Sequence, residues 1–174
     1  MNNQRGTTLI ELLIYIGIVG ILLTTVSVFL LNLLSIRVKT VAMSQVVGNA
    51  HLIQDRLSDA MRHAETINVG ASTFGSDPGV LSLNMVDVAD DPEVFSLTAD
   101  NGQFQVNKGV AGNVLLSSDG VEVTNLVFEQ LTSASDVGVV QVRFTLKTVN
   151  PSLNDLFHYE ESFQTTLRIP LDTQ

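Results

Sequence analysis

One carboxylate stands inside a long apolar segment near the start of the chain. Glu11 follows Arg5 and Gly6, and no further charged residue occurs before Arg37. A charge at the centre of a membrane helix costs about 2.5–3.5 kcal/mol on insertion scales, and less near the helix end. An ionisable residue in such a segment is a functional candidate, and the alternative is a stray polar residue near the water interface. In the first turn of a helix the macrodipole favours its negative charge.

A second group of carboxylates lies in the segment VDVADDPEV. The clustered residues are Asp87, Asp90, Asp91 and Glu93, with Asp100 nearby. Calcium prefers hard oxygen ligands of this kind, so these four residues are calcium candidates. The spacing does not match an EF-hand loop, which favours the alternative of a solvated acidic turn. The three histidines form no metal-binding pattern.

The chain has no pattern typical of an enzyme or a nucleic-acid-binding protein. It contains no cysteine, which excludes disulfides and cysteine-based metal sites. No G-x-S-x-G, P-loop or H-E-x-x-H motif occurs, so no nucleophile is assigned and no enzymatic activity is expected. With nine basic residues and a net charge of −9, no contact with nucleic acid is predicted, because phosphate backbones need basic patches.

The carboxylate at position 11 needs a long helix to hold it. The uncharged residues 12–36 number about 25, whereas about 20 are enough to span a bilayer as a helix. Arg37 and Lys39 then mark the water boundary. A cleaved secretory signal is the alternative, but its apolar region has only about 7–15 residues. Basic residues on both sides leave the orientation open by the positive-inside rule.

Past Arg37 the pattern stays helical but becomes one-sided. No proline occurs before Pro78, so we expect one helix from Thr8 to Ile67, about 90 Å long at 1.5 Å per residue. Its second half should press an apolar stripe against the domain after it. The residues of this stripe are Val46, Ala50, Ile53, Leu57, Ala60 and Ala64.

The remainder of the chain is predicted to be β-structure. Asn101-Gly102 between alternating segments indicates a hairpin with a two-residue turn, in which Ala99 faces Phe104 and Leu97 faces Val106. Asp119-Gly120 is interpreted as a second hairpin turn. Further strands are predicted at residues 80–88, 121–131, 139–148 and 163–171. In the second of these the apolar parity shifts near residues 126–128, which suggests a bulge or burial on both faces.

The opening RGTTLIELLIYIGIVGILL resembles the amino-terminal signature of type IV pilins and of the related pseudopilins of type II secretion and competence systems. The likeness lies in a short basic leader ending at Gly6, the T-L-I-E-L group and the apolar helix. Two departures are Thr7, where phenylalanine is usual, and Val28, where many major pilins have a proline. The implied fold is α+β and pilin-like: a long N-terminal helix, its first half transmembrane, packed on an antiparallel β-sheet head.

The resemblance also implies how the chain is processed. A prepilin peptidase would cut after Gly6 and methylate the new amine of Thr7, and Glu11 would pair with the amino terminus of a neighbouring subunit. The chain would then divide into a leader (1–6), a transmembrane part of the helix (7–36), its amphipathic extension (37–67) and a β-rich head (68–174). No cofactor is implied, apart from the calcium candidates.

The same resemblance implies location and partners. The chain would cross the bacterial cytoplasmic membrane once, with its start in the cytoplasm and its head outside, and would enter a cell-surface or periplasmic filament. Its partners would be other pilins or pseudopilins, prepilin peptidase, the inner-membrane assembly platform and membrane lipid.

The later strands are similar to those of minor members of the family, in particular J-type pseudopilins and minor pilins. The segments GVEVTNLVFEQL, GVVQVRFTLKT and YEESFQTTLRIPL carry this likeness. The expected function is therefore that of a structural, minor subunit of a type IV pilus or type II secretion-like filament. The alternative is a bitopic, membrane-anchored β-domain that binds a ligand and never enters a filament.

Overall fold

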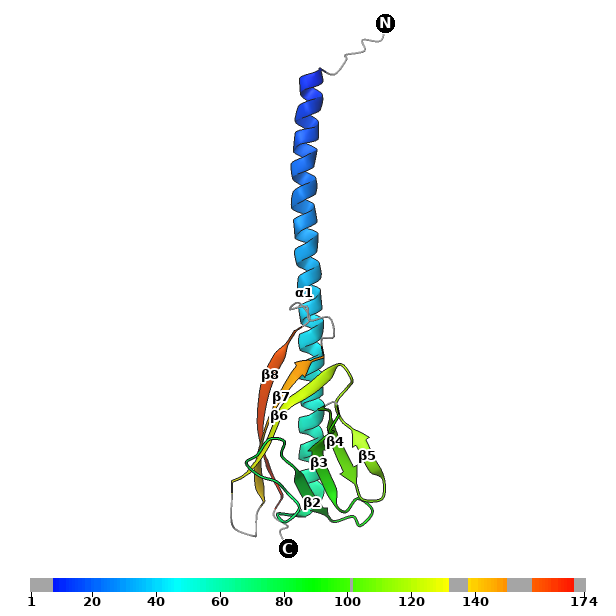
Figure 1. Ribbon diagram of the computed structural model, residues 1–174, viewed down its shortest axis with the longest axis vertical. Coiled ribbons are helices and arrows are strands. Elements are labelled where there is room, and N and C mark those ends of the chain that lie inside the picture. Colours follow the sequence, from blue (N-terminus) through cyan, green and yellow to red (C-terminus); the bar gives the residue numbers. More distant parts are fainter. Residues whose placement is uncertain (1–7, 101, 132–137, 150–157, 171–174) are drawn as a thin grey trace.

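The part of the chain that the structure describes forms one long helix and eight strands (Figure 1). The computed structural model describes residues 8–100, 102–131, 138–149 and 158–170. Helix α1 (Leu9–His63) is about 80 Å long at 1.5 Å per residue. The strands are β1 (Ala64–Ile67), β2 (Leu81–Met85), β3 (Glu93–Leu97), β4 (Phe104–Lys108), β5 (Gly112–Leu115), β6 (Val121–Gln130), β7 (Val139–Thr148) and β8 (Glu160–Arg168).

The described strands form two antiparallel sheets beside the second half of α1. One sheet has five strands in the order β1-β2-β3-β4-β5, and the other has three in the order β6-β7-β8. The first half of α1 projects from this head as a free rod (Figure 1). The arrangement confirms the α+β class and the long N-terminal helix on an antiparallel β head.

The core lies where the apolar stripe of α1 meets both sheets. All six residues of the predicted stripe are buried, with Leu57 and Ile53 at 0% exposed, and Ala42 and Met61 extend the stripe. One continuous cluster joins these side chains to residues of both sheets. Two ring stacks lie within or against this cluster, Phe95 on Phe104 and Phe144 on Phe163.

The helix ends at His63 rather than at the predicted Ile67. Residues 64–67 form β1, which pairs antiparallel with β2 in a register that places Ile67 opposite Leu83. The Asn84 side-chain amide also donates to the Thr66 hydroxyl at 2.8 Å. The β-branched Thr66 and Ile67 suit a strand better than a helix, and pairing with a distant strand is invisible to local periodicity.

The first predicted hairpin exists, but its register was wrong. β3 and β4 pair so that Leu97 faces Phe104 and Phe95 faces Val106. Thr98 and Gln103 close the turn, because the Thr98 amide donates to the Gln103 carbonyl at 2.9 Å and the Gln103 amide donates to the Thr98 hydroxyl at 2.9 Å. The turn is longer by two residues than predicted. Because the side-chain period of a strand is two, this register shift keeps each side chain on its predicted face.

The second predicted hairpin, at Asp119-Gly120, was wrong. β5 before it pairs with β4, and β6 after it pairs with β7. The segment is therefore the link from one sheet to the other. The Ser118 amide donates to the Asn49 side chain at 2.8 Å, which ties this link to α1. An Asp-Gly turn signal marks a chain reversal but does not specify which strands pair across it.

Strands β6 and β7 of the three-stranded sheet agree with the prediction. The β6–β7 register shifts between Val123 and Asn125, which is the predicted bulge, displaced a few residues towards the start of the strand. The bulge lets Val123 and Leu126 both face the core. In β7 the predicted inward residues are all buried: Val140, Val142, Phe144 and Leu146.

Candidate functional site

The first turn of α1 carries the unusual carboxylate. Thr8 is the N-cap residue, with an extended backbone. The backbone amides of Glu11 and Leu12 donate to the Thr8 carbonyl at 3.1 and 3.2 Å. Glu11 lies in this turn, where the positive end of the helix dipole favours a carboxylate. Among the residues that the structure describes, no cation pairs with it.

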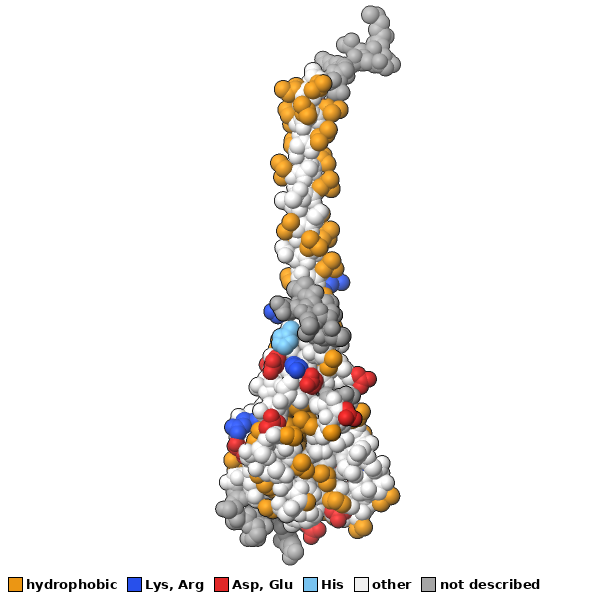
Figure 2. Space-filling model, viewed as in Figure 1, with side chains coloured by type: hydrophobic (Ala, Val, Ile, Leu, Met, Phe, Trp, Pro, Cys, Tyr) orange, Lys and Arg blue, Asp and Glu red, His pale blue; other side chains and the backbone are white. Residues whose placement is uncertain are grey.

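Residues 9–36 of α1, the shaft, are apolar on every side. Exposed large hydrophobic side chains occur throughout this part, from Leu9 at 79% to Ile36 at 62% exposed. Figure 2 shows hydrophobic side chains along the visible face and both edges of the rod, with Lys and Arg side chains first appearing where the rod meets the head. None of the apolar window is buried in the molecule. Such a surface requires lipid or other apolar helices around it.

The serine and threonine hydroxyls of the shaft between Thr24 and Ser35 are satisfied within the helix. The hydroxyls of Thr24, Ser27 and Ser35 each donate to the carbonyl four residues earlier, at 2.8, 2.8 and 3.0 Å. The Thr25 hydroxyl is within reach of two such carbonyls at 2.9 Å. A hydroxyl bonded in this way presents no unsatisfied polar group to hydrocarbon. Glu11 differs from these hydroxyls because it is a carboxylate that pairs with no cation among the described residues.

Residues 1–27 match the family model described as the prokaryotic N-terminal methylation motif. The chain carries the type IV prepilin signature. No curated protein and no solved structure matches the chain. The signature implies association with other pilins and processing by prepilin peptidase, and it points to a structural protein. Together with the apolar helix it indicates membrane anchoring.

The prepilin signature spans all three predicted processing and assembly residues. Glu11 is placed by the structure in the first turn of α1. Gly6 and Thr7 lie outside the described residues. The cleavage, methylation and pairing roles of these residues stay predictions.

The four calcium candidates lie in the segment before β3 and at its first residue. Asp87 and Asp91 accept hydrogen bonds from nearby backbone amides at 3.0 and 2.9 Å. The Asp90 carboxylate lies 3.5 Å from the Lys108 ammonium. Within the described residues, no group of three or more His, Cys, Asp or Glu side chains is placed to hold a metal ion. Calcium binding stays a prediction to which this geometry adds no support.

Glu93, the last of the four, is a buried charge that joins α1 to the five-stranded sheet. Its side chain is 1% exposed and accepts a hydrogen bond from Arg56 at 2.9 Å. The Lys108 ammonium lies 3.9 Å away. Burial raises the pKa of Glu93 above its ordinary value, and the charges of Arg56 and Lys108 act in the opposite direction. The Glu93 carboxylate and its two cations, Arg56 and Lys108, connect α1 to the five-stranded sheet. We call these three residues the clamp.

Neither cation beside Glu93 was singled out from the sequence, and the closer of the two is Arg56. It precedes Leu57 of the buried stripe, and its guanidinium also binds Asp59 at 2.8 Å. Its position beside the apolar stripe could have indicated a buried partner, because a long cationic side chain at the edge of an apolar face can reach into the core. Its partner lies 37 residues later in the chain, beyond the reach of helix periodicity.

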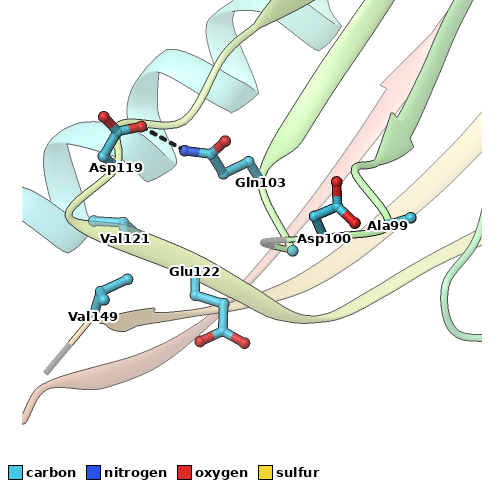
Figure 3. Close-up of a pocket in the computed structure, with 8 residues that line it drawn as sticks. Ala99, Asp100, Gln103, Asp119, Val121, Glu122 and Val149 are labelled. Atoms are coloured by element: carbon cyan, nitrogen blue, oxygen red, sulfur yellow. Dashed lines mark hydrogen bonds between the residues drawn. The ribbon is translucent and has the colours of Figure 1, made fainter. Parts of the chain in front are cut away.

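A polar hollow of about 580 Å³ lies between the β3–β4 turn and the start of β6 (Figure 3). Asp100, Asp119 and Glu122 line it. The Gln103 amide donates to Asp119 at 2.8 Å, and the Lys147 ammonium lies 3.2 Å from Glu122. Close by, the backbone amide of β6 residue Val123 donates to the Gly102 carbonyl at 2.8 Å. These contacts make the hollow a junction between the two sheets.

Proposed function

We propose that this chain is a structural subunit, of the minor class, of a type IV pilus or type II secretion-like filament. The observation that carries the proposal is a lone carboxylate, Glu11, in the first turn of an apolar helix that the head leaves bare, inside a matched prepilin signature. The minor class is supported by the likeness of the later strands to minor members. No enzymatic activity is part of the proposal.

In this proposal, cleavage creates the partner of Glu11. Prepilin peptidase cuts after Gly6 and methylates the new amine of Thr7. Before the cut there is no ammonium at this position. After it, the ammonium of one subunit meets the carboxylate of a neighbour in a surrounding of low dielectric, where the attraction is strong and the geometry decides its net value. Assembly thereby depends on processing.

The proposed location of the chain in the cell rests on the same prepilin signature and apolar helix. The chain crosses the bacterial cytoplasmic membrane once, with the head on the extracytoplasmic side, and is stored in lipid before the assembly platform draws it into a cell-surface or periplasmic filament. There the shaft exchanges lipid for the shafts of other pilins. Most of the acidic residues of the chain lie within residues 68–174, and we expect no nucleic-acid contact.

The test of processing is the mass of the N-terminus in purified membranes. We expect the native chain to begin at methylated Thr7, and a Gly6→Leu variant to keep the leader, because a side chain at this position crowds the cleft of the peptidase. An intact Met1 in the native chain, in cells that contain the peptidase, would favour the alternative of a plain membrane anchor.

The test of assembly is the amount of a Glu11→Ala variant in sheared filaments. A charge-assisted hydrogen bond contributes about 1.5–3 kcal/mol, so we expect incorporation to fall about tenfold or more. Membrane insertion and cleavage should be unchanged, and Glu11→Asp, which keeps the charge, should retain part of the incorporation. Normal incorporation of Glu11→Ala would remove the pairing role.

A further inference from the structure

The end of the head farthest from the shaft carries an exposed apolar cluster around one carboxylate. Val86, Val88 and Val110 are 73%, 83% and 88% exposed, and Asp87 lies between the first two. We call these four residues the distal cluster. Figure 2 shows hydrophobic and acidic side chains together at this end of the head. Valines so exposed add nothing to the core, which leaves them free for an outside contact.

Backbone hydrogen bonds place the distal cluster. The Val86 amide donates to the carbonyl of His63, the last residue of α1, at 3.3 Å. The Val110 amide donates to the Ala89 carbonyl at 3.2 Å. These bonds bring the β4–β5 turn against the loop after β2, near the end of the helix.

The opposite end of the head carries a groove of about 390 Å³, the proximal groove. It lies between α1 and the end of β7, and Arg37, Val38, Val41, Ala42 and Val149 are among the residues that line it. Val41 is 59% exposed. Among the described residues, no carboxylate pairs with Arg37. The groove thus has mainly apolar walls and, at its membrane side, a guanidinium that pairs with no described carboxylate.

We propose that the distal cluster of one copy of this chain docks in the proximal groove of a second copy, with Asp87 pairing with Arg37. The two surfaces are complementary, since each combines exposed valines with one charge, and the charges are opposite. This inference rests on the proposed function, because a filament is the assembly that stacks copies along their helices. Two adjacent copies are enough to form the contact.

The position of the two surfaces gives the contact its direction. Val41 and His63 are about 33 Å apart along α1 at 1.5 Å per residue. Joining the distal end of one head to the proximal end of the next keeps all helices pointing the same way. A contact between two different surfaces is heterologous and extends into an open filament. The contact is small, so it needs the high local concentration that packed shafts provide.

Disulfide cross-linking in sheared filaments tests the contact directly. The native chain has no cysteine, so an introduced pair has no competitor. We expect a chain with both Val41→Cys and Val110→Cys to form dimers and higher multimers on oxidation. Two single variants made in the same cell should form dimers only, and each single variant alone should form none.

A charge exchange tests the ionic part. Arg37→Glu places like charges together, which should lower cross-linking about tenfold or more. Asp87→Arg in the same chain should restore it. Lys39→Glu is the matched control, since it makes the same charge change on the same stretch of helix but does not line the groove, and it should leave cross-linking unchanged.

Several outcomes would overturn the inference. The first is a filament that contains normal amounts of the double cysteine variant but shows no cross-link. The second is a dimer formed by a single cysteine variant alone, and the third is a cross-link to a different subunit. If the cysteine pair blocks assembly, incorporation of the charge variants decides, and equal incorporation of Arg37→Glu and native chain would overturn the contact. Failure of the proposed function is distinct, because the native chain would then keep its leader and be absent from filaments.

Discussion

The two halves of α1 share one backbone geometry but are built for different surroundings. In the shaft, apolar side chains cover the whole circumference and remain exposed. In the half inside the head, the buried residues follow a single stripe and most of the other positions are polar. A helix that is apolar all round is suited to lipid or to a bundle of helices, whereas a one-sided helix is suited to one folded partner.

The charges of the two halves differ in the same way. Within the head, Arg56 is paired with Asp59 and with the buried Glu93. In the shaft, Glu11 has no partner among the described residues. The comparison teaches that the buried charge of the head half is paired within its own chain, while the shaft needs other molecules around it.

The largest effect that separates the halves should come from truncating a leucine in each. Leu57 is 0% exposed in the core, so Leu57→Ala should reduce the free energy of unfolding of the head by about 2–5 kcal/mol. Leu22, 58% exposed in the shaft, is the matched control, and Leu22→Ala should leave this value unchanged. Denaturant unfolding of the full chain in detergent, followed by circular dichroism, measures both. Equal losses would break the comparison.

The clamp of the head half should give the next largest effect. Arg56→Ala leaves Glu93 buried with Lys108 alone at 3.9 Å, so we expect a loss of about 1–3 kcal/mol in the free energy of unfolding at neutral pH. Arg62→Ala, a change at an exposed residue of the same helix, should alter stability by less than about 0.5 kcal/mol. If Arg56→Ala reduces the free energy of unfolding by no more than Arg62→Ala does, the contact between Arg56 and Glu93 does not stabilise the head.

The same clamp predicts a pH dependence. The folded chain raises the pKa of Glu93 above the ordinary value of 4.5, so it holds this proton at pH values where the unfolded chain has lost it. The contribution of this carboxyl to stability is therefore greatest below about pH 4.5 and declines as the pH rises through the folded pKa. The Glu93→Gln variant has no titratable group at this position. The native chain should gain stability relative to Glu93→Gln as the pH falls, and a gain with rising pH would contradict the burial argument.

The smallest effect should come from the solvent side of the head. The Lys147 ammonium lies 3.2 Å from the Glu122 carboxylate, and both side chains are more than a third exposed. Such pairs contribute about 0–1 kcal/mol, so Lys147→Ala should shift the unfolding midpoint only slightly, and less still at high salt. A loss comparable to that of Arg56→Ala would mean that the junction between the sheets carries more energy than the clamp.

Local patterns predicted the elements that the structure shows, and non-local pairing accounts for the errors. The stripe around Leu57, the alternation of β7 and the bulge of β6 were predictable, because each depends on the side-chain period of one element. The end of α1, the register at Leu97 and the link at Asp119-Gly120 were not. Each depends on which distant strand supplies the hydrogen bonds.

By itself, the sequence of this protein determined the shaft, the place of Glu11 and the prepilin signature. These features depend on residue order within one helix, and a helix satisfies its own backbone hydrogen bonds wherever it lies. Only the tertiary structure decided that the described strands form two sheets, that Arg56 meets Glu93, and that the exposed valines and the Arg37 guanidinium lie at opposite ends of the head. These depend on contacts between segments far apart in the chain, which burial and hydrogen bonding select together.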